Sequence, residues 1–157
     1  MSIIISIVPI VLGTLAATSA AATATTMVVT DTDKQKNNQG IIELSTNIRS
    51  ENLLRETLEK MGARNIQVNP KLLGGEIDNF HIAFVRKEDQ TFNIRFVGNV
   101  AQEEAVNFKN DLIAEYSNVV QNYVYETLKR KAEEKGLELK KEILQADQSI
   151  VLTYNVN

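Results

Sequence analysis

The stretch from Val119 to Val156 constrains the fold more than any other part of the chain. Its apolar residues first recur every three or four positions, which indicates an amphipathic helix. Gly136 then supplies a helix stop, and residues 137–143 begin a strand. Ala146–Ser149 has the composition of a turn, and the apolar residues alternate again after it. The stretch therefore predicts a helix followed by two strands of a sheet.

Two alternating segments upstream predict a hairpin with a tight turn at Lys87–Gln90. Its large apolar residues on one face are Phe80, Ile82, Phe84, Phe92, Ile94 and Phe96. Burying a large side chain is worth about 2 kcal/mol, so this face is a principal part of the core and needs a cover. The helical pattern from Gln102 to Lys135 supplies that cover, and the pair Ser117-Asn118 offers a break in it. The predicted buried stripe is Ala105, Phe108, Leu112, Tyr116, Val120, Tyr123 and Thr127.

The chain before this hairpin predicts a strand, a helix and a second strand. Residues 41–48 alternate like a half-buried strand, and Ser50 caps a helix that ends at Gly62. Residues 64–68 form a short strand, and residues 69–78, which contain Pro70 and two glycines, read as a loop. The order β-α-β-β-β-α-β-β predicts an α+β fold with an antiparallel-rich sheet of about five to six strands. Two helices are expected on one face, with an apolar N-terminal helix before the domain.

The first 30 residues differ from the rest because no side chain from Ser2 to Thr30 is charged. A bilayer core of about 30 Å is spanned by roughly 20 apolar residues, so residues 3–29 read first as a single-pass transmembrane anchor. Ala22-Thr23-Ala24 also suits a cleaved signal peptide, although the basic residues that begin such signals are missing. A third interpretation is an apolar helix bound to a partner. The predicted division is an apolar segment over 1–30, a polar linker over 31–40 and an α+β domain over 41–157.

Basic residues suggest an orientation for such an anchor. Lys34, Lys36 and Arg49 follow the apolar segment, and no Lys or Arg precedes it. Because cytoplasmic flanks carry the excess of basic residues, this distribution favours a body on the cytoplasmic side. The alternative is secretion after signal cleavage.

Composition excludes several functional classes. The 157 residues carry a net charge of −3, which argues against non-specific nucleic-acid binding because that needs a basic surface. The chain has no cysteine, which excludes disulfides, thiol nucleophiles and thiolate metal sites. His81 is the only histidine, and one histidine makes a poor metal site. Neither a cofactor nor a metal is expected.

Three segments resemble a known family. They are Ser45–Gly62, His81–Gly98 and Gln121–Val156, the last with Gln121, Tyr123, Tyr125, Gly136, Asp147, Ser149, Ile150 and Leu152 at matching places. Over residues 43–156 the chain resembles the hypothetical chloroplast reading frame thirty-five family, a domain of unknown function in plastids, cyanobacteria and other bacteria. Arg95, Phe96 and Val97 depart from its pattern after the central hairpin. The resemblance implies an α+β fold and an AAA-type ATPase as a possible protein partner, but no catalytic residue.

Four residues are candidates for a partner surface. The strand alternation places His81, Asn93 and Arg95 together on the polar face of the sheet. Tyr125 is expected to face away from the core stripe of the long helix, and tyrosine is favoured at interfaces. The leading hypothesis is a non-enzymatic interaction or assembly module tethered to a membrane through residues 3–29. The alternative is a soluble small-ligand binder or enzyme in which His81, Asn93 and Arg95 hold an anionic group.

Overall fold

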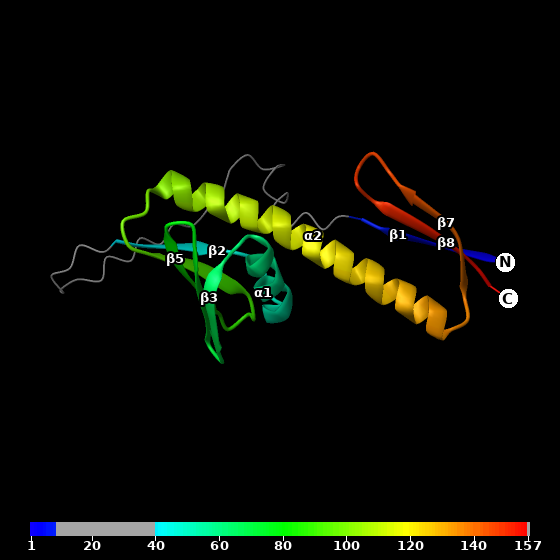
Figure 1. Ribbon diagram of the computed structural model, residues 1–157, viewed down its shortest axis with the longest axis horizontal. Helices are drawn as coiled ribbons and strands as arrows, with labels where there is room; N and C mark the ends of the chain where they lie inside the picture. The colour runs from blue at the N-terminus through cyan, green and yellow to red at the C-terminus, as the bar shows by residue number, and fades with distance from the viewer. Residues whose placement is uncertain (9–39, 157) are drawn as a thin grey trace. The chain divides into compact units, whose positions relative to one another are not determined.

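The computed structural model describes residues 1–8 and 40–156, which form two compact units (Figure 1). The central unit contains β2 (Ile41–Ser45), α1 (Glu51–Lys60), β3 (Arg64–Asn69), β4 (Leu72–Ile77), β5 (Phe80–Arg86), β6 (Phe92–Val97) and the first part of α2 (Gln102–Glu134), as far as Tyr116. The terminal unit contains β1 (Ser2–Ile7), the rest of α2, β7 (Glu138–Leu144) and β8 (Ile150–Asn155). The predicted α+β class with antiparallel sheets and two helices is confirmed.

The central sheet has five antiparallel strands in the order β2-β6-β5-β4-β3. Ile82 lies opposite Phe96 and Phe84 opposite Ile94, as the predicted hairpin requires, and all four side chains are buried. On this inner face Phe80 and Phe96 meet Phe108 of α2 with ring centroids 5.8 and 5.7 Å apart. Aromatic pairs at such separations favour edge-on contact, so α2 is fixed on the hairpin at a specific place.

Helix α1 begins where the sequence predicts. The Ser50 hydroxyl accepts a hydrogen bond from the backbone N–H of Leu53 at 3.3 Å, and Leu54 and Leu58 are fully buried. The carboxylate of Glu51 pairs with Arg86 at the end of β5 at 3.0 Å. Arg86 lies over the ring of Phe92, on the inner face of the sheet, so α1 contacts the same face as α2.

One predicted loop is a strand. Residues 72–77, taken as part of a loop over 69–78 because of Pro70 and the two glycines, form β4 and pair with both β3 and β5. Leu73 and Ile77 face the core, and Gly75 lies between them. A Cβ at Gly75 would lie 3.4 Å from the carbonyl oxygen of Arg64, so the glycine permits close approach of β3 at its bulge.

The terminal unit is a separate three-stranded sheet with β8 between β1 and β7. β1 pairs with β8 in an unbroken antiparallel register that places Ile5 opposite Leu152 and Ile7 opposite Ile150. Ile7, Ala132, Leu152 and Tyr154 form its buried cluster, with Val124 and Leu128 of α2 packed against it. The N–H of Val156 donates to the carbonyl of Met1 at 2.9 Å, so both ends of the chain belong to one unit (Figure 1).

Two predictions about these strands are wrong. Residues 2–7 form a strand and not the start of an apolar helix; the remainder of the predicted segment, residues 9–29, lies outside the described residues. Consecutive isoleucines favour a strand because β-branched side chains lose rotamer freedom in a helix. β7 and β8 do not extend the central sheet, because β8 finds its second partner in β1.

The helix α2 also differs from its predicted pattern. It continues through Ser117 and Asn118 without a break, although the division between the two units falls between Tyr116 and Ser117. Its buried stripe is confirmed as far as Tyr116. Beyond that point Tyr123 is 56% exposed, whereas Tyr125, predicted to face away, packs against the terminal cluster. The second part of α2 serves a different sheet, so the stripe of the first part does not continue.

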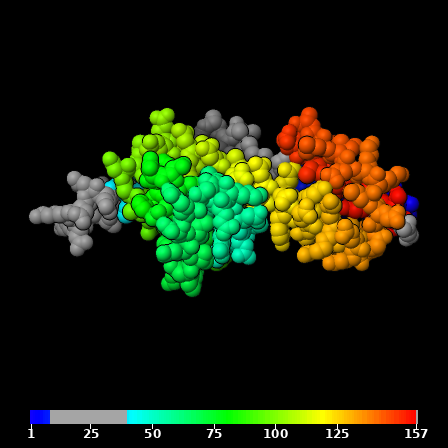
Figure 2. All heavy atoms as spheres, in the orientation of Figure 1, coloured from blue at the N-terminus to red at the C-terminus, as the bar shows by residue number. Residues whose placement is uncertain are grey.

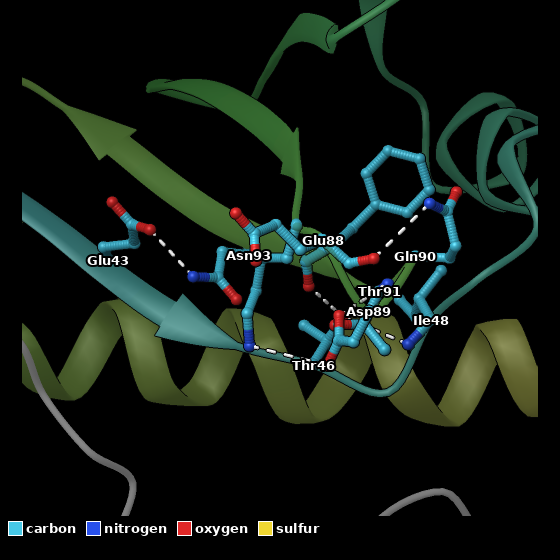
Figure 3. Close-up of polar contacts among 10 residues, drawn as sticks. Glu43, Thr46, Ile48, Glu88, Asp89, Gln90, Thr91 and Asn93 are labelled. Atoms are coloured by element: carbon cyan, nitrogen blue, oxygen red, sulfur yellow. Dashed lines mark hydrogen bonds and ion pairs between the residues drawn. The ribbon is translucent and has the colours of Figure 1, made fainter.

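Each of the two units contains a hairpin turn of the same kind. In the central unit the Asp89 carboxylate accepts hydrogen bonds from the backbone N–H and the hydroxyl of Thr91, and in the terminal unit the Asp147 carboxylate accepts them from the backbone N–H and the hydroxyl of Ser149. Figure 3 shows the first of these turns. These hydrogen bonds lower the pKa of both aspartates. The glutamine between them has a φ of 68° at Gln90 and 67° at Gln148.

The strands around these turns correspond as well. The strand after the turn, β6 or β8, is central and pairs with an N-terminal strand on its other side, β2 or β1. Ile94 and Phe96 in one unit correspond to Leu152 and Tyr154 in the other, and all four are buried. The chain thus uses one three-stranded arrangement twice and adds β3 and β4 in the central unit.

We expect Gln90→Gly and Gln148→Gly each to raise the free energy of unfolding by about 1 kcal/mol, because a left-handed residue other than glycine carries a steric cost of that size. Urea denaturation of the full chain measures the change. Ala146→Gly is the matched control, since Ala146 lies in the same turn as Gln148 without a positive φ. Equal changes in the control and the Gln148 variant would contradict the assignment.

Candidate functional site

The outer face of the central sheet is the surface opposite the inner, buried one. The register of the five strands places its residues in three rows across β3, β4, β5, β6 and β2. The first row is Asn69, Leu72, Val85, Asn93 and Ser45; the second is Gln67, Gly74, Ala83, Arg95 and Glu43; the third, from β4 onward, is Glu76, His81, Val97 and Ile41. This register brings the predicted residues His81, Asn93 and Arg95 onto one face.

The middle of the outer face carries two very small residues. Gly74 lies directly opposite Ala83 in the pairing of β4 with β5. Leu72 and Val85 form the neighbouring pair on one side, and Glu76 and His81 the pair on the other. Side chains stand out from the face of a sheet, so short side chains cover the backbone less than long ones do. The centre of the outer face therefore carries its shortest side chains, and Leu72 Cδ2 lies 3.7 Å from where a Cβ of Gly74 would be.

A carboxylate that the sequence reading did not single out organises the polar side of this face. Glu43 on β2 accepts a hydrogen bond from the side-chain amide of Asn93 at 2.8 Å and from Arg95 Nε and Nη2 at 3.2 and 3.0 Å. Figure 3 shows the side chains of Glu43 and Asn93 pointing toward one another across β2 and β6. The hydrogen bond from Asn93 and the nearby Arg95 guanidinium lower the pKa of Glu43, against an opposing effect of burial.

His81 belongs to a second group on the same face. Its Nδ1 lies 3.5 Å from a carboxylate oxygen of Glu76, and Asn65 donates to the other oxygen at 3.2 Å. The histidine side chain is 69% exposed. The face thus holds two polar groups, each centred on a glutamate, with the small pair Gly74 and Ala83 between them. Asn93 and Arg95 share one carboxylate, and His81 contacts the other.

Tyr125, the fourth predicted residue, lies in the terminal unit. Its hydroxyl is 3.0 Å from each carboxylate oxygen of Glu142 on β7 and accepts a hydrogen bond from Lys129 Nζ at 3.3 Å. The ammonium group also lies 4.9 Å from the centre of the tyrosine ring, and the hydrogen bond to Tyr125 raises the pKa of Lys129. Tyr125 therefore connects α2 to β7 within its own unit.

Glu43 and Glu76 were missed because sequence alone does not state which strands are neighbours. Glu43 lies in a predicted strand, but its position opposite Arg95 follows only from the pairing of β2 with β6. Glu76 lay in a predicted loop. Opposite charges on facing strands could have indicated both glutamates, but only after the strand order is known.

Two broader features concern ligands and membranes. Among residues 1–8 and 40–156, no three His, Asp or Glu side chains gather closely enough to hold a metal ion. Neither helix in the described part of the chain combines the length and apolar character needed to cross a membrane.

No protein-family model matches the chain, and neither the curated proteins nor the solved structures give a match. The resemblance to the chloroplast reading frame family accordingly stays a prediction.

We expect Glu43→Gln to lower the free energy of unfolding at pH 7 by about 1 kcal/mol, a value reduced for solvent screening. The pKa of Glu43 is below its usual 4.5 in the folded chain, so its carboxylate stabilises the fold above that pH. The difference between wild type and variant should shrink as the pH falls below 4.5. Denaturant titrations from pH 3 to 7 measure this dependence.

Glu59→Gln is the control for this prediction. Glu59 pairs with Arg55 on the exposed side of α1, and its side chain is 54% exposed. Removing that charge should cost no more than about 0.5 kcal/mol. A Glu43 effect that is as small as the control, or that does not change with pH, would contradict the role given to Glu43.

Proposed function

We propose that this chain is a non-enzymatic interaction module and that the outer face of the central sheet docks a protein partner. The observation that carries the proposal is the pair of very small residues, Gly74 and Ala83, at the centre of the outer face. Partly exposed apolar residues lie at both ends of the face: Leu72 and Val85 at one, Val97 and Ile41 at the other. A centre of very small residues, with apolar pairs at both ends of the face and polar groups beside it, suits a protruding side chain of a partner, because hot-spot residues pack where the fit is close.

The charged groups support a protein partner more than a small anion. An anionic ligand would need the positive charge of Arg95, and that charge is already paired with Glu43 at 3.0 Å. Displacing Glu43 would leave its carboxylate without these hydrogen bonds, which is costly. The glutamates instead keep Arg95, Asn93 and His81 in defined positions around the centre. An AAA-type ATPase is the partner that the family resemblance implies.

Membrane association through the apolar N-terminal residues remains part of the proposal, with a restriction on its form. A segment that crosses a bilayer once leaves its two flanks on opposite sides. β1 precedes residues 9–39 and β8 comes after them in the chain, and the two strands pair through hydrogen bonds in one sheet. This pairing supports association without a single crossing. Signal cleavage after Ala24 would remove β1 and leave β8 without a partner on that side, so the pairing also argues against a secreted form.

We expect Ala83→Arg to abolish partner capture, because a long cationic side chain would stand at the centre of the outer face, where Gly74 and Ala83 carry its shortest side chains. The full-length chain and the variant are used as baits in the native cell extract after mild crosslinking, and recovered proteins are quantified. A genuine partner should be recovered at least ten-fold less with the variant.

Asn52→Arg is the matched control, since Asn52 is exposed on α1 and lies outside this face. It should recover the partner like the wild type. Capture that is unchanged by Ala83→Arg, or lost equally in both variants, would contradict docking at the outer face. Amide hydrogen exchange of both variants establishes that the sheet remains folded.

A further inference from the structure

The two sheets of the described chain have four edge strands: β2 and β3 in the central sheet, β1 and β7 in the terminal sheet. An edge strand exposes unpaired backbone N–H and C=O groups, which can pair with a strand of another chain. Folded proteins that stay monomeric commonly protect such edges with charges, bulges, proline or short strands. The four edges can therefore be compared by the protection that each one carries.

Three of the edges are protected. β7 has a bulge between Leu139 and Lys141, and its sequence ELKKEIL contains four charged residues (Figure 2, orange). β3 has a bulge between Arg64 and Gln67, a positive φ at Asn65, and Pro70 directly after its end. β2 has five residues with Glu43 in the middle. Each of these strands would place a charge or an irregular backbone against an incoming strand.

β1 has none of these features. Its sequence SIIISI has no charge and no proline, and its register with β8 has no bulge. Ile3 and Ile4 are 42% and 70% exposed, and Val8 beyond the strand is 62% exposed. Ile3 belongs to the row of side chains that continues through Ile5 and Ile7 into the buried cluster. An added strand would cover this row and pair with the backbone groups on the side of β1 away from β8, where no other described strand lies.

We propose that β1 pairs with β1 of a second copy of this chain in antiparallel orientation, which joins two terminal units into a continuous six-stranded sheet. The absence of charge on β1 indicates which strand pairs with it, because an uncharged edge is best matched by a strand that is itself uncharged. Among the edge strands of the described residues, only β1 meets that condition. Antiparallel self-pairing also gives the two-fold symmetry that is commonest among homo-oligomers. The inference does not depend on the outer face of the central sheet.

The test measures the mass of the full-length chain in solution by light scattering across a concentration series. The wild type should be a dimer, and Ile4→Lys should be a monomer. Antiparallel self-pairing brings residues near the two-fold axis opposite their own copies, so two lysines would repel one another there. Ile4 is exposed and points away from the buried cluster, so the substitution leaves β1 paired with β8.

Ile143→Lys provides the matched control. Ile143 is an apolar residue on the other edge strand of the same sheet and is 39% exposed. It should leave the dimer intact. A monomeric wild type, a dimeric Ile4→Lys variant, or equal dissociation by both substitutions would each overturn the proposal. Circular dichroism of all three proteins verifies that the fold is retained, and a variant that unfolds is replaced by Ile4→Thr, for which weakened dimerisation is the expected result.

Discussion

Hydrogen bonding between β1 and β8 joins the first residues of the chain to the last strand. Without β1, β8 would have one neighbour, β7, whose seven residues are all exposed. A two-stranded hairpin is marginal in water by itself, and a third strand with a packed helix makes it stable. Ile7 supplies one of the four buried side chains of the terminal cluster. The terminal unit thus depends on a strand that is distant in sequence from its other elements.

In the central unit the hairpin of β5 and β6 also has a further strand beside it, because β2 pairs with β6 as β1 pairs with β8. The shared turn, with its aspartate and its hydroxyl two residues later, positions each hairpin, and an N-terminal strand then completes each sheet. β2 carries Glu43 and β1 carries only serine and isoleucine. The outer face of the central sheet therefore contains a carboxylate that holds neighbouring polar side chains, whereas the terminal sheet has an uncharged edge strand. This contrast separates the two proposed surfaces: the first suits a different protein, and the second suits a copy of the same chain.

Local patterns predicted most of the individual elements. The alternation of Phe80–Phe96, the cap at Ser50 and the turn at Asp89 were readable because the forces involved act over a few residues. The number of sheets was not readable, because it depends on which strand pairs with β8. β4 was not predicted because glycines such as Gly75 are typical of loops. The reason for a glycine in this strand, the close approach of the Arg64 carbonyl, is visible only in the structure. For the site, the sequence placed His81, Asn93 and Arg95 on one face, but the glutamates that hold them required the strand order.

The cysteine-free chain allows a direct test of the β1–β8 pairing. Ile4 and Thr153 lie opposite one another in the register, and facing residues in antiparallel strands have the Cα separation that a disulfide needs. The double variant Ile4→Cys/Thr153→Cys should form an intramolecular disulfide under mild oxidation in the native cell, where any membrane association is preserved. Ile5→Cys/Thr153→Cys should not form one, because those side chains lie on opposite faces. Absence of the disulfide in the first variant, or equal yield in both, would contradict a terminal unit completed by β1.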